Sequence, residues 1–545
     1  MKAFLLIIVF IASGVVFAQD IRTIPQSNLL SLTQRLNSAG LISTRDYFFK
    51  LKPSVFIAND FRRYPETPGE LNPSEIALFR HSETQYSYDL TGDLNRYSVT
   101  VGSPYSLLND SIYNVFYSES ENDYSFFMNG IMESDVSTDL HNGTNSSYLK
   151  AGMILGGRIN DFYYYFSATN GSASGDKNNY LRISSFRQNF KFNEKPESSF
   201  FDETHGFISY QTKHLSIKLG RDYVLLGHSS NFPLLDNSNL PIDQFSIQIQ
   251  TNHFNYSHLH AKVLDKIVTV NDTVAGPINS SVDKHIAYHR FSITLFSDLV
   301  LGLGEFVIYS DRGLDLSYIN PFSFYKSIEH ANRDRDNSIL FMDVFYNTGK
   351  RIQPYGLLLI DDIDFAKAGT GWWGNQVLYN AGFWVFSNLD WIPFDVNVDW
   401  LKVEPYVFSH RIQRNNFANN GIGLASTILP NSENYAVSGK FYLNTRLNLL
   451  FSYIYTEHGS NYTDSNGNVK YNAGGDINTG KRITDSDIII FGSGERERIN
   501  KIKLELTWDF ILNFRTTFGI DYNHIKSEHY FREHFYNYIK LSLKF

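Results

Sequence analysis

The chain has 545 residues, and its 48 Lys and Arg against 56 Asp and Glu give a formal net charge of −8. This balance excludes the basic surface that a nucleic-acid-binding protein needs to neutralise phosphates. A hydrophobic content of 42% excludes a disordered chain, and the lack of cysteine excludes disulfides, thiolate catalysis and cysteine-ligated zinc. Aromatic residues make up 16% of the chain and charged residues only 19%, below the roughly 25% of typical soluble domains.

The first 18 residues have the pattern of an export signal. Lys2 supplies a positive charge, residues 3–16 are apolar, and Val16-Phe17-Ala18 forms a cleavage site before Gln19. The apolar part is too short for a membrane-spanning helix, which needs about 20 residues. We therefore expect residues 1–18 to be a cleaved signal peptide and the mature protein to be exported.

A short helical element is expected next, over residues 19–60. Its apolar residues recur at helical spacing, Ser27-Asn28 could supply the N-cap, and Gly40 could cap the end of the helix. Pro53 and Pro65 interrupt the chain before the first strands. We expect this element to lie in the periplasm near the mouth of a barrel. The apolar positions are Leu29, Leu30, Leu32, Leu36 and Leu41.

The remainder, residues 61–545, has the two-residue alternation of strands with one polar and one apolar face. At the C-terminus, Ile539, Leu541, Leu543 and Phe545 are apolar and the residues between them are polar. Short turn signals alternate with long polar stretches, which is typical of outer-membrane β-barrels, and about 10 residues per tilted strand suggests roughly 16 to 20 strands. The sequence therefore predicts an all-β, antiparallel transmembrane barrel of about 18 strands. The turn signals are Asn142-Gly143, Asn170-Gly171 and Asn466-Gly467.

The aromatic end of the last strand resembles the assembly signal of bacterial outer-membrane barrels. Phe545 closes an alternating strand, so we expect it to be read by the barrel-assembly machinery. The outer face of such a barrel would contact outer-membrane lipid. Tyr and Phe enrichment suits the aromatic girdles at the two membrane interfaces.

The sequence contains no complete motif for catalysis or metal binding. His258 and His260 flank Leu259 and would share one strand face, but no third metal ligand is evident. The chain has no Gly-x-Ser-x-Gly elbow and no phosphate-binding loop. We therefore expect no catalytic residues, no metal and no cofactor, and a protein that is not an enzyme.

Dense polar clusters between about residues 205 and 385 need another explanation, since neither turns nor a lipid-facing strand would require them. Inside a barrel such groups either pair across the lumen as a salt-bridged plug or form a ligand site, because lipid disfavours them by a few kcal/mol at the midplane. The candidate residues are Arg221, Asp222, Asp236, Asn237, Asp311, Arg312, Asp315, Asn320, Glu329, His330, Asp334, Arg335, Asp336, Asn337, Asp361, Asp362, Trp372, Trp373 and Asn375.

The order of these clusters resembles the Wzi-type capsule-assembly family of outer-membrane proteins. The ordered motifs are Gly-Arg-Asp-Tyr from Gly220, Leu-Asp-Asn from Leu235, Tyr-Ser-Asp-Arg-Gly-Leu-Asp-Leu from Tyr309, Tyr-x-Asn-Pro from Tyr318, then Glu-His, Asp-Arg-Asp-Asn, Ile-Asp-Asp and Trp-Trp-Gly-Asn. The chain departs from the family pattern at Gly227-His228-Ser229-Ser230, where relatives often have a Gly/Pro-rich stretch.

The resemblance implies an 18-stranded barrel with a periplasmic helical element. It also implies a non-enzymatic, lectin-like role in holding capsular or other surface polysaccharide at the cell exterior. Sugar rings stack on aromatic side chains, and their hydroxyls pair with carboxylates, amides or guanidinium groups. If Trp372 and Trp373 lie on a strand, their side chains face opposite sides and only one of them can stack inside. The alternative function is an outer-membrane channel for small solutes or oligosaccharides.

Overall fold

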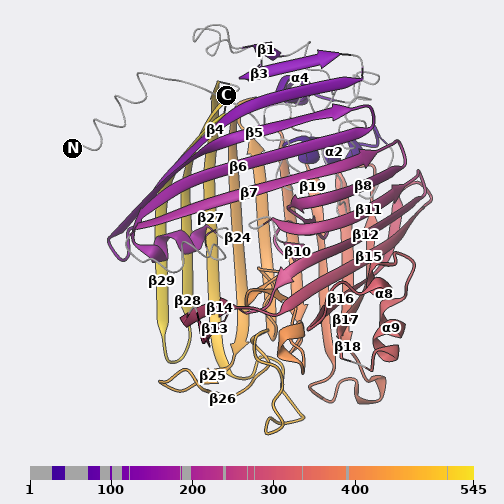
Figure 1. Ribbon diagram of the computed structural model, residues 1–545, viewed down its shortest axis with the longest axis vertical. Helices are drawn as coiled ribbons and strands as arrows, with labels where there is room; N and C mark the ends of the chain where they lie inside the picture. The colour runs from indigo at the N-terminus through magenta and orange to yellow at the C-terminus, as the bar shows by residue number, and fades with distance from the viewer. Residues whose placement is uncertain are drawn as a thin grey trace.

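The computed structural model describes residues 28–42, 71–85, 98–100, 113–121, 123–183, 186, 198–236, 241–266, 268–274, 276–333, 335–387, 389, 392–511 and 513–544. Figure 1 shows long strands wrapped into a barrel, with the helices α2 (Asn28–Ser38) and α4 (Pro73–Gln85) near one end and long loops at the other. The predicted signal peptide and Phe545 lie outside the described residues.

The wall is a closed antiparallel barrel of 18 strands, which confirms the predicted fold class. The last strand, β29, pairs with the first long strand, β4, and so closes the ring. A short strand, β3 (Tyr117–Glu121), pairs with the part of β4 that β29 does not reach. Closure leaves the wall without an unpaired edge.

The strands of the ring are β4 (Tyr124–Asp139), β5 (Thr144–Ile159), β6 (Phe162–Gly175), β7 (Ser198–Gln211), β8 (Leu215–Asp222), β11 (Ile242–Gln250), β12 (Phe254–Leu264), β15 (Asp283–Leu295), β16 (Leu299–Ser310), β17 (Asn337–Tyr346), β18 (Ile352–Asp362), β19 (Gln376–Phe386), β20 (Phe394–Val403), β23 (Ser432–Tyr442), β24 (Leu447–Ser460), β27 (Glu495–Ile511), β28 (Phe514–Lys526) and β29 (Phe531–Lys544).

Smaller elements are not part of the ring. The short strands are β1 (Ser98–Thr100), β2 (Tyr113–Val115), β9 (Leu225–Leu226), β10 (Leu235–Asp236), β13 (Val268–Asp272), β14 (Gly276–Ser280), β21 (Ala418–Asn419), β22 (Ile422–Gly423), β25 (Tyr462–Thr463) and β26 (Val469–Tyr471). The short helices are α8 (Leu316–Ile319), α9 (Tyr325–Ala331), η4 (Lys177–Arg182), η5 (Phe365–Lys367) and η6 (Gln413–Asn415). No helix in the described part of the chain is long and apolar enough to span a membrane.

The two ends of the barrel differ in the length of their connections. At the end that we call the turn end, residues 160–161 join β5 to β6 and residues 347–351 join β17 to β18. At the opposite end, called the loop end, the connections include residues 311–336, 404–431 and 461–494. This asymmetry is typical of outer-membrane barrels.

The predicted turn at Asn170-Gly171 is not a turn. Both residues lie inside β6, where Gly171 pairs with Lys150 of β5. A Cβ atom at Gly171 would lie 2.6 Å from the Leu149 carbonyl oxygen and 2.7 Å from the Phe201 ring. This glycine therefore permits a close approach of neighbouring strands, which is the other common use of glycine within a strand.

Alternation along the strands sets the two faces of the wall. In β20, Asp395, Asn397 and Asp399 are buried and point into the lumen. In β29, the lumenal Tyr536 and Tyr538 are buried, whereas Ile539 lies on the outer face and is exposed. The period-two pattern of the sequence is thus the inside–outside pattern of the barrel.

Helices α2 and α4 pack at the turn end. Helix α2 ends with Gly40 at a φ of 75°, and the amides of Gly40 and Leu41 donate to the carbonyls of Asn37 and Leu36. The helical spacing and the glycine cap expected from the sequence are both present. Helix α4 lies beyond residue 60, so the helical part of the chain extends further than the 19–60 element expected from the sequence.

Two loops from the loop end fold into the lumen, and we call them the first plug (residues 223–236) and the second plug (residues 404–431). The amide of Asp236 in the first plug donates to the carbonyl of Leu424 in the second at 2.7 Å. Their apolar side chains join lumenal wall residues in one buried core. The plug members of this core are Val224, Leu226, Phe232, Leu234, Leu235, Val407, Phe408, Phe417, Leu424, Ala425 and Ile428.

Candidate functional site

The tip of the first plug is fixed to the wall by a buried ionic cluster. Arg290 of β15 donates from Nε and Nη2 to the two carboxylate oxygens of Asp343 in β17, at 2.8 and 2.7 Å. His228 of the plug lies 2.8 Å from the same carboxylate, between Nε2 and Oδ1. The side chains of all three residues are at most 1% exposed. Because an unpaired charge is costly in such surroundings, this cluster holds the plug inside the barrel.

A second wall carboxylate binds the adjacent plug residues. Ser229 Oγ and Asn231 Nδ2 each donate to Asp399 Oδ2 at 2.8 Å. On the same side of the lumen, the Trp384 indole donates to the His228 carbonyl at 3.0 Å. The stretch at which the sequence departs from the Wzi-type pattern is therefore the tip of the plug.

The second plug is held by polar groups that line the loop end of the lumen. Asp361 is buried and accepts a hydrogen bond from the Phe408 amide at 2.6 Å. Asn337 donates to the Asn415 carbonyl at 2.9 Å, and Lys284 donates to Asn416 Oδ1 at 2.8 Å. Of the predicted site residues, Asp361 and Asn337 thus position the plug.

Another group of predicted residues lies on the outer face of the wall, not in the lumen. Arg312 donates to both carboxylate oxygens of Asp336 at 2.9 and 2.7 Å, and its Nε donates to Asp315 at 3.1 Å. Asp336 also accepts from the Tyr318 hydroxyl at 2.8 Å. The sequence predicted that these charged residues form a network in the lumen. They lie outside it, because Asp336 precedes the lumenal Asn337 and therefore points to the opposite face.

The remaining predicted residues are spread over the barrel. Arg221 pairs with Asp243 on the outer surface, whereas Asp222 is buried and pairs with Lys218. Asp236 accepts from Ser426 at 3.2 Å, and Asp311 pairs with Arg414. Asn320 ends α8, and His330 lies in the last turn of α9. Glu329 is buried and pairs with Lys326, whereas Arg335 is exposed. Asn237 and Asp334 lie outside the described residues.

Aromatic rings and cations gather at the loop end in a group that we call the tryptophan cluster: Trp372, Trp373, Tyr406, Lys367 and Lys481. The ring centroids of Trp372 and Trp373 are 5.8 Å apart, and Trp373 makes an edge contact with Tyr406 at 6.0 Å. Lys367 Nζ lies 3.9 Å from the Trp372 ring, and Lys481 Nζ lies 5.3 Å from the Trp373 ring. Both tryptophan rings are partly exposed.

The two tryptophans are not on a strand, so the expected separation of their rings onto opposite faces does not occur. They precede β19 in the 363–375 loop, which pairs with the 461–494 loop through Trp372 and Ile488. The Trp373 amide donates to the Asp487 carbonyl at 3.0 Å, and Asn375 donates to the Lys367 carbonyl at 2.9 Å. Contacts between loops therefore hold both rings in one place.

Polar groups next to the cluster supply hydrogen-bonding capacity. Arg482 Nε and Nη2 donate to Asp485 at 2.9 and 2.7 Å, and Asn472 donates to the other oxygen of that carboxylate at 2.8 Å. Partial burial on its own raises the pKa of Asp485, but the hydrogen bonds from Arg482 outweigh it and hold this pKa below its usual value. Asp362 is exposed at the end of β18, opposite the buried Asp361. Stacking surfaces thus lie beside amide, carboxylate and guanidinium groups.

Sequence reasoning missed several residues that hold the plugs in place. Arg290, Asp343 and Asp399 stand singly on their strands. Arg290 pairs with Asp343 53 residues away, and the plug partners of Asp343 and Asp399 are 115 and 170 residues away in the chain. A local signal did exist, since a charged residue among apolar lumenal positions of a strand requires a partner. The partner itself cannot be read from such a signal.

Acid is expected to loosen the second plug through His410. Burial lowers the pKa of His410 to about 4, and its Nδ1 accepts a hydrogen bond from the Ile412 amide at 3.2 Å. Because the ordinary pKa is about 6.5, the opened loop gains a proton between pH 6.5 and 4 that the closed loop excludes. The closed state is therefore fully favoured above pH 6.5 and loses up to about 3 kcal/mol as the pH falls toward 4.

Hydrogen exchange of residues 404–431, corrected for the intrinsic rate, measures this effect at pH 7 and pH 4.5. The acid-induced opening should be smaller in a His410→Gln variant, whose amide does not titrate. An equal response in the variant would assign the opening to another group.

No family model and no curated protein matches the sequence. Among solved structures, the chain is similar to Wzi of Escherichia coli, described as an outer-membrane protein involved in group 1 capsule assembly and a carbohydrate-binding β-barrel. The identity is 12% and the TM-score 0.55, over 98% of this chain and 100% of that one. OpdK of Pseudomonas aeruginosa has 9% identity and a TM-score of 0.41, over 77% and 98% of the chains. OccAB4 of Acinetobacter baumannii has 9% identity and a TM-score of 0.43, over 78% and 99%. At these identities, the likeness to Wzi shows that the two proteins share a barrel fold.

Proposed function

We propose that this protein is a non-enzymatic outer-membrane barrel that binds capsular or other surface polysaccharide at its loop end and holds it at the cell exterior. On this proposal, the signal peptide of residues 1–18 directs export, and the barrel-assembly machinery reads Phe545 during insertion. The turn end then faces the periplasm, the loop end faces outward, and the outer wall contacts lipid.

The observation that carries this proposal is the plugged lumen beneath an aromatic loop end. The two plugs pack an apolar core against the lumenal face of β11 to β23, and Arg35 of α2 is anchored to the wall at the turn end. This arrangement favours a binding surface over a path for solutes, so it supports the polysaccharide role above the channel alternative.

The tryptophan cluster has the chemistry that a sugar chain requires. An indole ring offers a flat apolar surface for the C–H face of a sugar ring, and the lysine cations that lie over the two rings favour acidic sugars. Asp362 and the Arg482–Asp485 pair add acceptors and donors for hydroxyl groups. The proposed site residues are therefore Trp372, Trp373 and Asp362 of the predicted set, joined by Lys367 and Lys481.

Replacing Trp373 with alanine is expected to weaken polysaccharide retention without removing the barrel. Loss of one stacking surface should weaken binding about tenfold, which corresponds to about 1.4 kcal/mol. Trp372→Ala and Asp362→Ala should have the same direction of effect. The measurement is surface polysaccharide per inserted barrel, from whole-cell glycan labelling divided by the heat-modifiable barrel band on gels.

A matched control is Trp508→Ala, which removes an exposed tryptophan from β27 near the turn end. Its retention ratio should equal that of the natural protein. An unchanged ratio in Trp372→Ala, Trp373→Ala and Asp362→Ala would refute the binding role and leave these residues with packing roles.

A further inference from the structure

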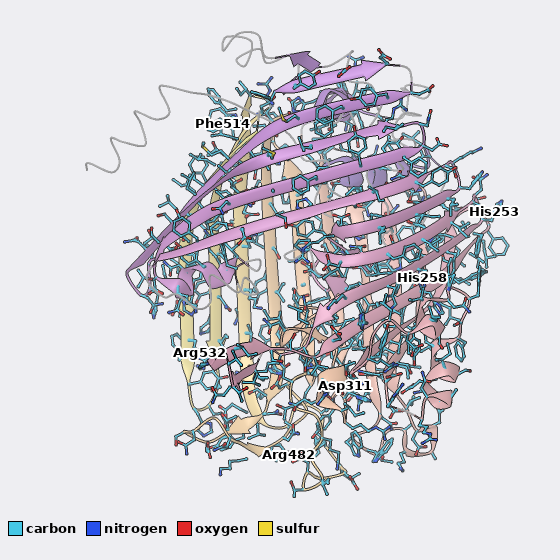
Figure 2. The ribbon with its side chains drawn as sticks, in the orientation of Figure 1. His253, His258, Asp311, Arg482, Phe514 and Arg532 are labelled. Carbon is cyan, nitrogen blue, oxygen red and sulfur yellow. The ribbon has the colours of Figure 1, made fainter. Side chains whose placement is uncertain are left out.

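The connection between β16 and β17, residues 311–336, runs along the outside of the wall, and we call it the outer strap. It leaves β16 at the loop end, forms α8 and α9, and returns to β17. Figure 1 shows both helices beside β16 to β18, outside the ring of strands. In Figure 2, Asp311 marks its start, and His258 and His253 mark the β12 wall along which it extends.

The wall beneath the outer strap is unusually polar for an outer face. Strand register places His258 beside His289, and His289 beside Glu305, all on the outer side. Both His258 and Glu305 are nevertheless buried. No group of three or more side chains suited to a metal ion occurs among the described residues, so these histidines need other partners.

The outer strap supplies partners for this polar wall. The Tyr325 amide donates to Glu305 Oε2 at 2.9 Å, and the Tyr325 hydroxyl lies 3.3 Å from His258 Nδ1. The Tyr325 ring stacks on His289 with centroids 4.3 Å apart. Within the strap, Tyr318 and Arg312 bind the buried Asp336, so Tyr325, Tyr318 and Arg312 direct their polar groups to the wall or to the strap itself.

The side of the strap that points away from the protein is apolar. Leu316 is 79% exposed and Phe322 is 83% exposed, and Leu314 and Phe324 are also exposed. No exposed residue between Leu314 and Phe324, a fully described stretch, carries a charge. The exposed polar residues of this stretch, Ser317 and Asn320, are uncharged, whereas a water-facing loop commonly exposes charged side chains.

The strap also extends along most of the height of the wall. Phe322 stacks on Tyr256 with centroids 6.1 Å apart and ring planes 16° apart. Tyr256 is only three residues from His253, which lies in a connection at the turn end. Exposed charged residues, Arg333 and Arg335, occur where the strap has returned to the loop end. The apolar part of the strap therefore lies level with strand segments between the two ends of the barrel.

We propose that the outer strap is a lipid-binding surface, in which Leu314, Leu316, Phe322 and Phe324 pack among the acyl chains of the membrane while its inner face covers the polar wall. This inference rests on the outer-membrane location in the proposed function. The strap makes the lipid-facing belt continuous with exposed wall residues of the neighbouring strands, including Leu303 and Met342. Without the strap, His258 would lose Tyr325, Glu305 would keep only His289 as a partner, and both polar side chains would face hydrocarbon, which is unfavourable.

Single-cysteine variants test this surface cleanly because the chain contains no cysteine of its own. Leu316→Cys and Phe322→Cys carry a nitroxide label in the full-length barrel, reconstituted in phosphatidylcholine vesicles. Collisions with oxygen, which concentrates in acyl chains, are compared with collisions with a water-soluble nickel chelate. Leu303→Cys, half exposed on β16, is the wall reference, and Ile483→Cys, fully exposed in the 461–494 loop, is the water reference.

The expected result is that both strap sites match Leu303→Cys, with an oxygen-to-nickel accessibility ratio at least tenfold above that of Ile483→Cys. Strap sites that match Ile483→Cys while Leu303→Cys reports lipid would overturn the inference and leave the proposed function intact. Strap sites shielded from both reagents would also overturn it, since a second copy of the chain would then cover the surface. Nickel access at Leu303→Cys would instead reject the membrane location on which both proposals rest.

Discussion

Replacing Asp343 with alanine is expected to convert a closed barrel into one that conducts ions. Asp343 binds Arg290 of the wall and His228 of the first plug, and all three side chains are buried. Removing the carboxylate takes away the bidentate partner of the buried Arg290 guanidinium, and breaking a buried ion pair in this way costs about 3 to 5 kcal/mol. Water must then enter to solvate the guanidinium group, and the plug tip loses its attachment to β17.

Single-channel recording in planar bilayers measures the effect. The natural barrel should show no steady conductance, whereas Asp343→Ala should show open events. The double variant Arg290→Leu with Asp343→Leu also loses the His228 contact but removes both charges together, so it should show fewer open events than Asp343→Ala, since an apolar pair of similar volume tolerates burial. Conductance in the natural barrel equal to that of Asp343→Ala would favour the channel alternative.

The second large effect is expected at the turn end, from Arg35→Ala. Arg35 donates to Glu75 of α4 at 2.7 Å and to Asp395 of β20 at 2.5 Å, and it is buried with both. Arg351 binds Glu75 from the β17–β18 turn at 2.6 Å. Loss of Arg35 leaves Asp395 and Glu75 short of a partner, so the free energy of unfolding should fall by about 3 to 5 kcal/mol.

Guanidinium titration in vesicles, followed by tryptophan fluorescence, measures this loss. The control Arg80→Ala removes an exposed arginine from α4 and should change the free energy of unfolding by no more than about 0.5 kcal/mol. Equal losses in the two variants would show that the buried network does not anchor the helices.

The same network predicts how the stability of helix docking changes with pH. Burial on its own raises the pKa of Glu75, but hydrogen bonds and charge from Arg351 and Arg35 outweigh it and hold the pKa below its usual value. A carboxylate with a lowered pKa stabilises the folded state above its unfolded pKa of about 4.3, and this contribution is lost as the pH falls through the folded value. Helix docking should therefore weaken in acid in the natural protein and respond less in Arg35→Ala.

Local patterns predicted the wall and the first helix well. Alternation of apolar residues fixes which side chains of β29 face outward, and leucine spacing with Gly40 fixes the end of α2. The same local signals were wrong at Asn170-Gly171, where the small side chain serves close strand packing. They also misplaced the rings of Trp372 and Trp373, because a loop pairing, not a strand, determines their orientation.

The candidate site was harder to predict because its geometry depends on where long loops go. Arg312 and Asp336 are close in sequence and do pair, but one residue of register decides whether they face lumen or exterior. His228 and Asp343 pair across 115 residues, with nothing near either one to indicate the other. The sequence therefore identifies the polar residues that need partners. It does not determine whether each of them faces the lumen or the exterior.

The packed lumen has a consequence for how the chain folds. Ser229 meets Asp399 across 170 residues, Ser230 meets Ser438 across 208, and the ring closes only when β29 reaches β4. Contacts of such high sequence separation make folding slow, since loop closure must precede the gain from contact. The plugs cannot be threaded into a sealed cylinder, so the strands must assemble around them. Unfolding should accordingly be one steep transition in which the interior and the wall are lost together, with no stable empty barrel along the way.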